Sequence, residues 1–425
     1  MRDLVAVIAE PNRRRLLELL VDGEQTVTRL AAHFESTRSA ISQHLAVLVD
    51  AGLVEARKEG RFRYYRLIPE GMAELRASLD SFWTQELADL AAARPPKQGE
   101  PAMPVEKSIL VPLGPDETFA LLTEPDRLRR WHTVSARIDL RAGGDYRWTV
   151  VPGHTAAGKV VEVEPGRRLV LSWGWEEADD LPPGASTVTI TLEPAEGGTQ
   201  VHLVHEGLTD AQATSHAEGW SHYLERLRVA AAEGDAGADE WAASPDPMDR
   251  LSAAEASLAQ CQLVLRGIGA SDATSSTPCA KFTVDDLVEH LLGSISSLGS
   301  MAGAEVVVPS DVPMEPRVAT AAQQALEAWR RRGTEGNVTF GSGEMPASRA
   351  ANILSVEFLV HAWDFAAATS QTLTPSDALS DYVLDRAREL IAPSMRDGER
   401  FAVEAEVGPD AGALERLVAF TGRSG

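Results

Sequence analysis

The chain has 425 residues, and because domains usually hold about 100–200 residues it is expected to fold into several of them. Hydrophobic residues make up 44% and charged residues 24%, which excludes a disordered chain, and no run of roughly 18 apolar residues is present to cross a membrane. The net charge of −23 argues against nonspecific nucleic-acid binding by the whole molecule, but residues 1–70 are nearly balanced, with 11 basic and 10 acidic side chains.

Two stretches interrupt the regular patterns and are predicted to be linkers. Residues 95–104 contain four prolines, which cannot continue a helix, and residues 233–247 are rich in Gly, Ala, Asp and Pro. The chain is therefore expected to be a multidomain α+β protein with domains at residues 1–94, 105–232 and 248–425. The N-terminus lacks the features of a signal peptide, so a cytoplasmic location is expected, in which the two cysteines would be reduced.

The first segment has the order of elements of a winged helix-turn-helix. A helix from Pro11 ends at Asp22-Gly23, a short helix covers 26–34, and a third helix begins near Ser36-Thr37, whose hydroxyls suit a helix N-cap. Two short helices joined by a tight turn place the second in the major groove of DNA. Residues 54–58 and 61–67 then flank Glu59-Gly60 as a β-hairpin.

The third helix and the hairpin carry side chains suited to double-stranded DNA. Gln pairs with adenine, Arg pairs with guanine, and basic residues on a wing contact phosphates. The candidates on the helix are Arg38, Ser39, Ser42, Gln43 and His44, and those on the wing are Arg57, Lys58, Arg61 and Arg63. The alternative is a small helical domain whose arginines only cover its surface.

The phrases RRRLLELL, TVTRLAAHFESTRSAISQHLAVLVDAGLVEARKEGRFRYYRL and GMAELRASLDSFW resemble the winged helices of the arsenic-repressor (ArsR) family over residues 1–93. The resemblance implies a homodimer formed around Val5–Ile8 and Leu75–Leu90. Metal-sensing members carry a cysteine pair before the recognition helix, whereas here that stretch is Thr26-Val27-Thr28-Arg29-Leu30 and no cysteine precedes Cys261. A signal is therefore expected to enter elsewhere.

The second segment alternates as strands do, at 136–140, 145–150, 158–164, 168–175, 187–193 and 200–206, and ends in a helix from about Gly219 to Ala232. His202 and His205 fall on opposite faces of one strand, which argues against a shared metal site. Because no nucleophile–base pair is evident, ligand binding is expected rather than catalysis.

The start VEKSILVPLGPDETFALLTEPDRLRRWH and the helix GWSHYLERLRVA resemble the helix-grip (SRPBCC, START-like) fold, in the branch named for chaperone-ATPase activators. The resemblance implies an antiparallel sheet around a long C-terminal helix, with a pocket for a small-molecule ligand between them. Candidate pocket residues are Trp131, Trp148, Trp173 and Trp220, together with Trp175, and the alternative is that several are core aromatics.

The third segment is predicted to be helical, at 248–267, 284–300, 320–332, 347–369 and 376–392. Glu357 and His361 are spaced i, i+4 and share one helix face, and His290 comes from an earlier helix. Two histidines and one glutamate from facing helices suit a divalent metal, above all zinc, with a position left open. On spacing alone, a buried histidine–carboxylate pair fits as well.

The phrases TPCAKFTVDDLVEHLLG, EFLVHAWDFAAAT and LERLVAFTGR resemble the DinB-like, all-α four-helix bundles related to mycothiol-dependent maleylpyruvate isomerase. That resemblance implies metal ligands at His290, Glu357 and His361. Cys279 is interpreted as structural, with a fourth ligand or redox thiol as the alternatives, and Asp364 is interpreted as orienting a ligand or as a solvated carboxylate.

Two functions follow from these patterns. The first is a homodimeric transcriptional regulator whose operator affinity responds to a ligand or metal in the second or third segment. The second is a metal- and thiol-dependent transferase or isomerase with an attached DNA-binding domain. The completeness of the winged helix favours the regulator.

Overall fold

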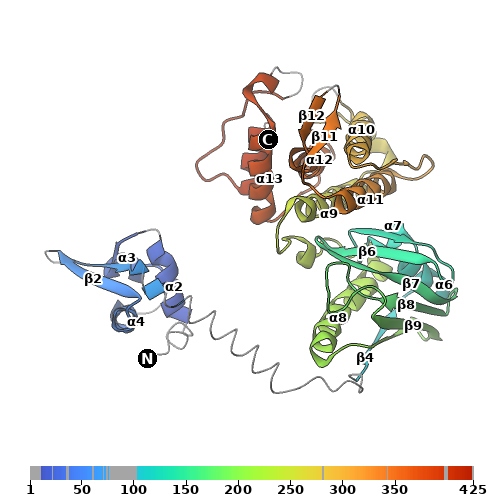
Figure 1. Ribbon diagram of the computed structural model, residues 1–425, viewed down its shortest axis with the longest axis horizontal. Coiled ribbons are helices and arrows are strands. Elements are labelled where there is room, and N and C mark those ends of the chain that lie inside the picture. Colours follow the sequence, from blue (N-terminus) through green and yellow to red (C-terminus); the bar gives the residue numbers. More distant parts are fainter. Residues whose placement is uncertain are drawn as a thin grey trace. The chain divides into compact units, whose positions relative to one another are not determined.

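The computed structural model describes residues 11–21, 23–34, 38–59, 62–69, 71–72, 75, 103–279, 282–341, 343–396 and 401–423. The chain divides into two compact units, Met1–Glu100 and Pro101–Gly425, which are coloured along the sequence in Figure 1. The helices predicted for dimerisation, Val5–Ile8 and Leu75–Leu90, lie outside the described residues except for Leu75, and so does most of the predicted linker 95–104.

The first unit is a helix-turn-helix followed by a β-hairpin, as the sequence predicts. Its three strands pair in the order β1-β3-β2. The described elements are α2 (Pro11–Val21), β1 (Gln25–Thr26), α3 (Val27–Ala31), α4 (Arg38–Asp50), β2 (Val54–Glu59) and β3 (Phe62–Leu67).

Local chemistry accounts for these elements. The Thr26 hydroxyl caps α3 by accepting from the Arg29 N–H group. Along α4, Ile41, Leu45 and Leu48 recur at helical spacing and are fully buried against the other helices. Gly52 then adopts a φ of 75°, which lets the chain leave α4 and enter the hairpin.

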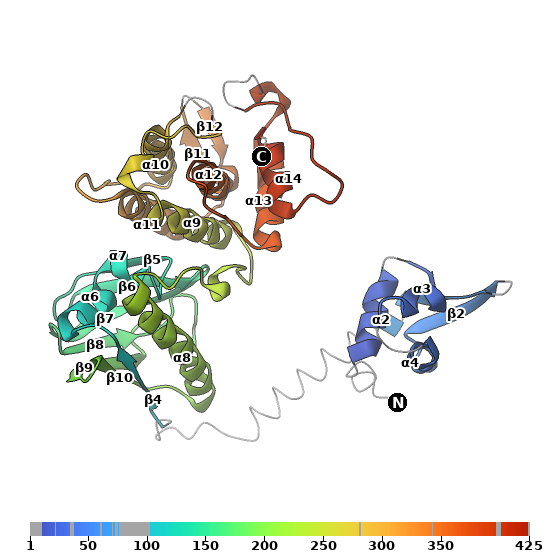
Figure 2. The ribbon, with the colours of Figure 1, turned by 180° about the vertical axis from the view of Figure 1, so that it is seen from behind.

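The second unit begins with a seven-stranded antiparallel sheet of order β4-β10-β9-β8-β7-β6-β5, and α8 lies along one of its faces (Figure 2). We call residues 103–233 the sheet lobe. Its elements are β4 (Val105–Val111), α6 (Pro115–Thr123), α7 (Pro125–Leu128), β5 (Ser135–Ile138), β6 (Asp145–Val151), β7 (His154–Glu164), β8 (Arg168–Trp173), β9 (Ser186–Ala195), β10 (Gly198–Glu206) and α8 (Asp210–Glu233).

Helix α8 is longer than the sequence pattern predicted. It begins at Asp210, not near Gly219, because Thr209 and Gln212 form a capping box in which each side chain bonds to the other's backbone N–H group. The predicted start was therefore wrong by more than two turns. The extra turns carry His216, which lines the cavity described below.

Residues 250–423 form a helical lobe, in which α9, α10, α11 and α12 pack side by side (Figure 1). A short hairpin interrupts it, which the all-α prediction did not include. The elements are α9 (Arg250–Arg266), α10 (Val284–Met301), α11 (Met314–Arg332), β11 (Asn337–Phe340), β12 (Gly343–Pro346), α12 (Ala347–Ala368), α13 (Asp377–Leu390) and α14 (Ala413–Phe420). In the part of the chain that the structure describes, no helix has both the length and the apolar content needed to cross a bilayer.

Buried ion pairs join the sheet lobe to the helical lobe. The guanidinium of Arg129, next to α7, donates two hydrogen bonds to Glu315 of α11, at 2.9 and 3.0 Å, and both side chains are at most 4% exposed. Arg266 of α9 lies 3.5 Å from the same carboxylate. Burial alone would raise the pKa of Glu315, but hydrogen bonds from Arg129 hold it below its ordinary value. The carboxylate therefore stays ionised between two arginines.

A second bridge connects the helical lobe to the β6–β7 turn. Arg330 of α11 donates to both oxygens of the buried Glu255, at 3.0 and 2.7 Å. Glu255 also accepts the backbone N–H of Gly153, at 2.8 Å. Because charged groups are buried only when they are paired, these contacts fix one arrangement of the two lobes.

Candidate functional site

The residues predicted to contact DNA lie on α4 and on the hairpin of the first unit. Gln43 is exposed on α4, and Ser42 and His44 beside it are half-buried. Arg38 and Ser39 belong to the first turn of the same helix. Of the predicted wing residues, Arg57, Lys58 and Arg63 are exposed on β2 and β3, whereas Arg61 lies outside the described residues.

Arg57 makes two intramolecular contacts that the sequence did not predict. It donates to both oxygens of Glu24, at 3.2 and 3.0 Å, and its guanidinium lies 5.5 Å from the centre of the Tyr64 ring. The hydrogen bonds from Arg57 lower the pKa of Glu24 below its ordinary value. Glu24 is thus the ion-pair partner of one of the predicted wing arginines.

A cavity of about 390 Å³ lies in the sheet lobe between the sheet and α8. Aromatic side chains dominate its wall, and the residues used below are His132, Trp173, Trp175, Glu177, His216, Gly219, Trp220, Tyr223 and Trp241. A cavity of this size and lining is typical of sites for small, largely apolar ligands.

The predicted pocket tryptophans divide into two groups. Trp173 and Trp220 line the cavity, and so does Trp175. Trp131 and Trp148 do not line it: both are buried in the core behind it, and Trp131 donates its indole N–H to the carbonyl of Leu121. Trp131 and Trp148 are therefore core aromatics, which is the alternative that the sequence left open.

Trp241 was missed because it lies in the stretch predicted to be a linker. Arg226 of α8 donates to the carbonyls of Gly237 and Ala238, at 2.8 and 2.9 Å, and so anchors this stretch against the sheet lobe. Trp241 stacks on His222 with ring centres 4.1 Å apart and planes 9° apart. An isolated aromatic residue in a Gly- and Asp-rich segment was the only sequence signal for it.

Two hydrogen bonds from tryptophan to histidine determine which ring nitrogens of His205 and His216 carry a proton. Trp220 donates its N–H to Nδ1 of His205, at 3.1 Å, and Trp175 donates to Nε2 of His216, at 3.2 Å. An indole N–H only donates, so each of these ring nitrogens carries no proton. His205 must then donate from Nε2 to the Ser186 hydroxyl, 2.9 Å away. It cannot take a proton from Ser186, and this pair is not an activated nucleophile.

Burial keeps two of the histidines in this lobe neutral. His132 and His205 are at most 4% exposed, and burial lowers the pKa of each to about 3. Neither His132 nor His205 therefore carries a positive charge at neutral pH.

The stability of this lobe should fall as the pH drops below about 6.5. The unfolded chain takes up protons on these histidines near pH 6.5, whereas the folded chain does so only near pH 3. Stability is thus complete above pH 6.5 and is lost toward pH 3. We expect His205→Gln to remove about 1.4 kcal/mol per pH unit of this dependence, measured by urea unfolding at pH 7.5 and 5.5. The control is His202→Gln, because His202 is half-exposed on the other face of β10. If the free energy of unfolding changed equally with pH in the two variants, the prediction would be contradicted.

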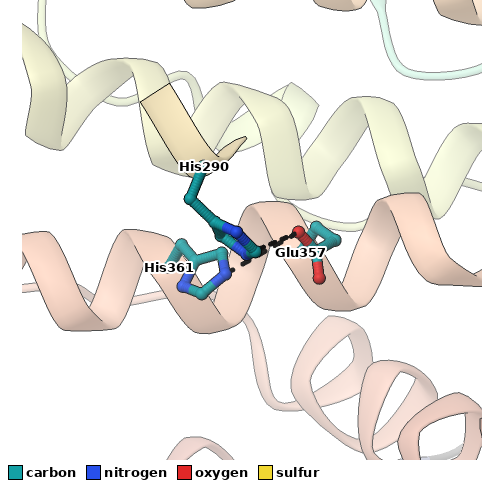
Figure 3. A group of neighbouring side chains, drawn as sticks. All are labelled: His290, Glu357 and His361. Carbon is teal, nitrogen blue, oxygen red and sulfur yellow. Dashed lines mark ion pairs between the residues drawn. The ribbon is translucent and has the colours of Figure 1, made fainter. Parts of the chain in front are cut away.

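A second cluster lies in the helical lobe, where His290 projects from α10 toward Glu357 and His361 of α12 (Figure 3). One Glu357 oxygen lies 3.6 Å from Nε2 of His290 and 3.7 Å from Nε2 of His361. This oxygen is buried and has no hydrogen-bond partner among the described residues. The structure thus brings together the three residues that the sequence singled out.

The geometry of the three atoms fits a divalent metal. Ligand atoms bound at about 2.0–2.1 Å to a tetrahedral Zn²⁺ lie roughly 3.4 Å from one another. The two distances from the Glu357 oxygen are slightly longer than that and too long for hydrogen bonds, and all three ligand atoms lie within 4.8 Å of one another. A buried carboxylate oxygen without a donor, facing two imidazole nitrogens, is the arrangement that a cation would complete.

Asp364 orients one member of the cluster. It is fully buried and accepts from Nδ1 of His361, at 2.9 Å, which leaves Nε2 of that ring without a proton and facing Glu357. Arg423 donates to both Asp364 oxygens, at 2.7 and 2.6 Å. Burial alone would raise the pKa of Asp364, but Arg423 and His361 hold it below its ordinary value. The solvated-carboxylate interpretation of Asp364 does not hold.

Cys279 lies on the loop before α10 and is half-buried. Burial raises the pKa of its thiol, so the thiolate form that binds metal or attacks substrate is disfavoured. Phe282 on the same loop stacks on His290 with ring centres 5.1 Å apart. This loop therefore contributes the packing that orients His290.

Two family descriptions match parts of the chain. Residues 10–56 match the description "Bacterial regulatory protein, arsR family", which covers α2, α3, α4 and the start of β2. Residues 113–232 match "Activator of Hsp90 ATPase homolog 1-like protein", which covers most of the sheet lobe. Both descriptions agree with the two resemblances drawn from the sequence.

Several curated proteins are similar to the chain over a large part of their own length. An HTH-type transcriptional regulator of Mycobacterium tuberculosis is 44% identical over 84 residues, which are 20% of this chain and 78% of that protein. The arsenical resistance operon repressor of Staphylococcus xylosus is 32% identical over 97 residues, 23% of this chain and 91% of the repressor. An uncharacterized protein of M. tuberculosis is 30% identical over 184 residues, 42% of this chain and 99% of that protein.

Proposed function

The chain belongs to the arsR family of bacterial regulatory proteins, and on that premise we propose that it binds operator DNA as a homodimer and that ligands of its second unit control this binding. The observation that carries the proposal is the exposed Gln43 of α4 next to a basic hairpin. A recognition helix of this kind reads base edges, and a basic hairpin contacts phosphates.

Dimerisation follows from the geometry of DNA. Two recognition helices must lie about 34–36 Å apart to read successive turns of the major groove, so a dimer reads a site that one subunit cannot. A ligand that binds one dimer geometry more tightly shifts the population toward it, by no more than its difference in affinity for the two.

The aromatic cavity is the proposed site of the controlling ligand. It is enclosed by the sheet, α8 and the anchored segment that carries Trp241, and its walls are largely apolar. The match of this domain to an activator of Hsp90 ATPase concerns its fold, and a shared fold does not imply a shared function.

The cluster of His290, Glu357 and His361 is proposed to hold a divalent metal, with zinc as the first choice. Two imidazole nitrogens and one carboxylate oxygen are the ligand types that zinc takes, and three protein ligands leave one position open. A bound metal would act there as a Lewis acid or as a structural ion.

A second candidate function rests on this cluster. The His290 side chain is 39% exposed, so the cluster can be approached from solvent at this ligand, although His361 and the Glu357 oxygen are buried. This favours a metal- and thiol-dependent transferase or isomerase over a purely structural ion. Steady turnover of a thiol conjugate by the full-length protein, lost in His361→Ala, would support the enzyme.

The proposed regulator is tested by DNA binding of the full-length protein to its own upstream region, measured by fluorescence anisotropy at several salt concentrations. We expect salt-dependent, sequence-selective binding. Gln43→Ala and Arg38→Ala should each cost about 1–3 kcal/mol of discrimination between the operator and a scrambled sequence. Arg63→Ala should weaken binding to both sequences and reduce the salt slope by about one.

Binding of equal strength to operator and scrambled DNA, by protein that is folded, would contradict the regulator. A monomer at the protein concentration that saturates the operator, measured by analytical ultracentrifugation, would contradict the homodimer alone.

A further inference from the structure

Gly219 is an unusual residue for its place in α8. It lies near the middle of a 24-residue helix, where glycine is about 1 kcal/mol less favourable than alanine. Its backbone is not in the left-handed region, and a Cβ atom built on it would meet nothing within 4 Å. Neither backbone geometry nor close packing in this structure therefore requires a glycine here. The empty space belongs to the aromatic cavity, which Gly219 lines.

Three indole rings stand around this space in fixed orientations. The ring centre of Trp173 lies 5.3 Å from that of Trp220 and 5.7 Å from that of Trp175. The N–H groups of Trp175 and Trp220 are already bonded to His216 and His205. These two rings therefore offer carbon surface to an occupant, and their hydrogen bonds prevent them from turning to fill the cavity themselves.

The charged and titratable groups of the wall do not favour a charged occupant. Glu177 accepts the backbone N–H of Thr155, at 2.9 Å, and its other oxygen lies 3.7 Å from Arg330 of the helical lobe. His216 accepts from Trp175 and contacts the Gln212 carbonyl, and burial lowers its pKa, as it does that of His132. An anionic ligand would lose its water without gaining a partner of opposite charge from these groups.

We infer that this cavity takes an uncharged, flat aromatic molecule, which lies against the α8 backbone at Gly219 and contacts the surrounding indole rings at their faces and edges. A flat ring can approach the helix closely only where the side chain is absent, which explains why the glycine is present. Aromatic walls bind such rings by offset and edge-to-face contacts. The inference deepens the proposed function by giving the chemical class of the controlling ligand.

The test is calorimetric titration of the full-length protein, without DNA, with three probes. These are 2-naphthol, which is flat and uncharged at neutral pH, 2-naphthoate, which has the same rings with a negative charge, and decan-1-ol, which is apolar but flexible. We expect 2-naphthol to bind one per chain and the other two to bind at least about tenfold more weakly, a difference of ~1.4 kcal/mol.

Two variants of Gly219 test whether the bound molecule lies against α8 at this residue. Gly219→Leu should reduce the affinity for 2-naphthol at least about tenfold by filling the space over α8. Gly219→Ala should bind it more weakly than the native chain while raising the midpoint of thermal unfolding, because alanine is the better helix former, and this rise would show that the fold is kept. The control is Gly293→Leu, in an exposed helical glycine of α10 whose Cβ would also meet nothing within 4 Å. The control variant should bind 2-naphthol with the same affinity as the native chain.

Binding of 2-naphthoate or decan-1-ol as tightly as 2-naphthol would overturn the ligand class. If Gly219→Leu bound 2-naphthol as tightly as the native chain, the proposed position of the ligand against Gly219 would be overturned. Operator binding of the same preparations is measured separately, so its loss would count against the proposed regulator and leave the ligand class standing.

Discussion

Glu315→Gln is expected to lower the free energy of unfolding of the second unit by about 3–5 kcal/mol, because it leaves a buried guanidinium without its ionised partner. Arg129 is 2% exposed and donates two hydrogen bonds to this carboxylate, and Arg266 lies 3.5 Å from it. A neutral amide retains the shape but not the charge. The remaining acidic neighbour of Arg129, Asp126, is half-exposed and cannot replace it. The measurement is guanidinium unfolding of the full chain, followed by tryptophan fluorescence.

The matched control is Glu289→Gln in the same lobe. Glu289 also pairs with an arginine, Arg317 at 2.8 Å, but its side chain is 61% exposed. Exposed pairs of this kind contribute about 0–1 kcal/mol. An apolar double replacement, Arg129→Met with Glu315→Leu, should recover most of the lost stability because it removes both buried charges. If Glu315→Gln were no more destabilising than the control, the lobes would not depend on this ion pair.

Asp364→Asn is expected to weaken zinc binding by about 10- to 100-fold, the usual effect of changing the group that orients a metal-bound histidine. The carboxylate fixes which nitrogen of His361 carries the proton and raises the basicity of the other one. An asparagine can still accept one hydrogen bond but supplies no negative charge. The measurement is competition for zinc between the full-length protein and a coloured chelator, with circular dichroism to confirm the fold.

Asp381→Asn is the control for this change. Asp381 lies in α13 of the same lobe and pairs with Arg416 at 2.7 Å, but half of its side chain is exposed and it is not part of the cluster. This variant should bind zinc as the native chain does. Stoichiometric zinc binding that is equal in Asp364→Asn and in the native chain would contradict the orienting role, and an absence of zinc binding in the native chain would contradict the proposed metal site itself.

Local sequence patterns were sufficient for the helix-turn-helix and for two of the three residues of the proposed metal cluster. Ile41, Leu45 and Leu48 define a buried helix face by spacing alone, and Gly52 marks the end of that helix. Glu357 and His361 share a face of α12 because they are one turn apart. These features depend on neighbours within a few residues, which is the range over which a sequence pattern carries structural information.

The sequence offered His290 as a candidate ligand from an earlier helix, but its place beside Glu357 and His361 depended on packing. Its place in α10 is predictable, but only the contact between α10 and α12 brings its Nε2 atom to 3.6 Å from Glu357. The start of α8 was misplaced for a different reason, because the capping box of Thr209 and Gln212 went unnoticed. That signal was local and was available in the sequence.

The sequence by itself determined the DNA-binding module and the sheet-and-helix character of the second segment, and it singled out the three residues of the proposed metal cluster. Only the tertiary structure decided which tryptophans line the cavity, that Trp241 from the presumed linker joins them, and that Arg129 meets Glu315 across 186 positions of the chain. Burial and partnership of an aromatic or charged side chain depend on which distant segments pack against it. No periodicity in the neighbouring residues carries that information.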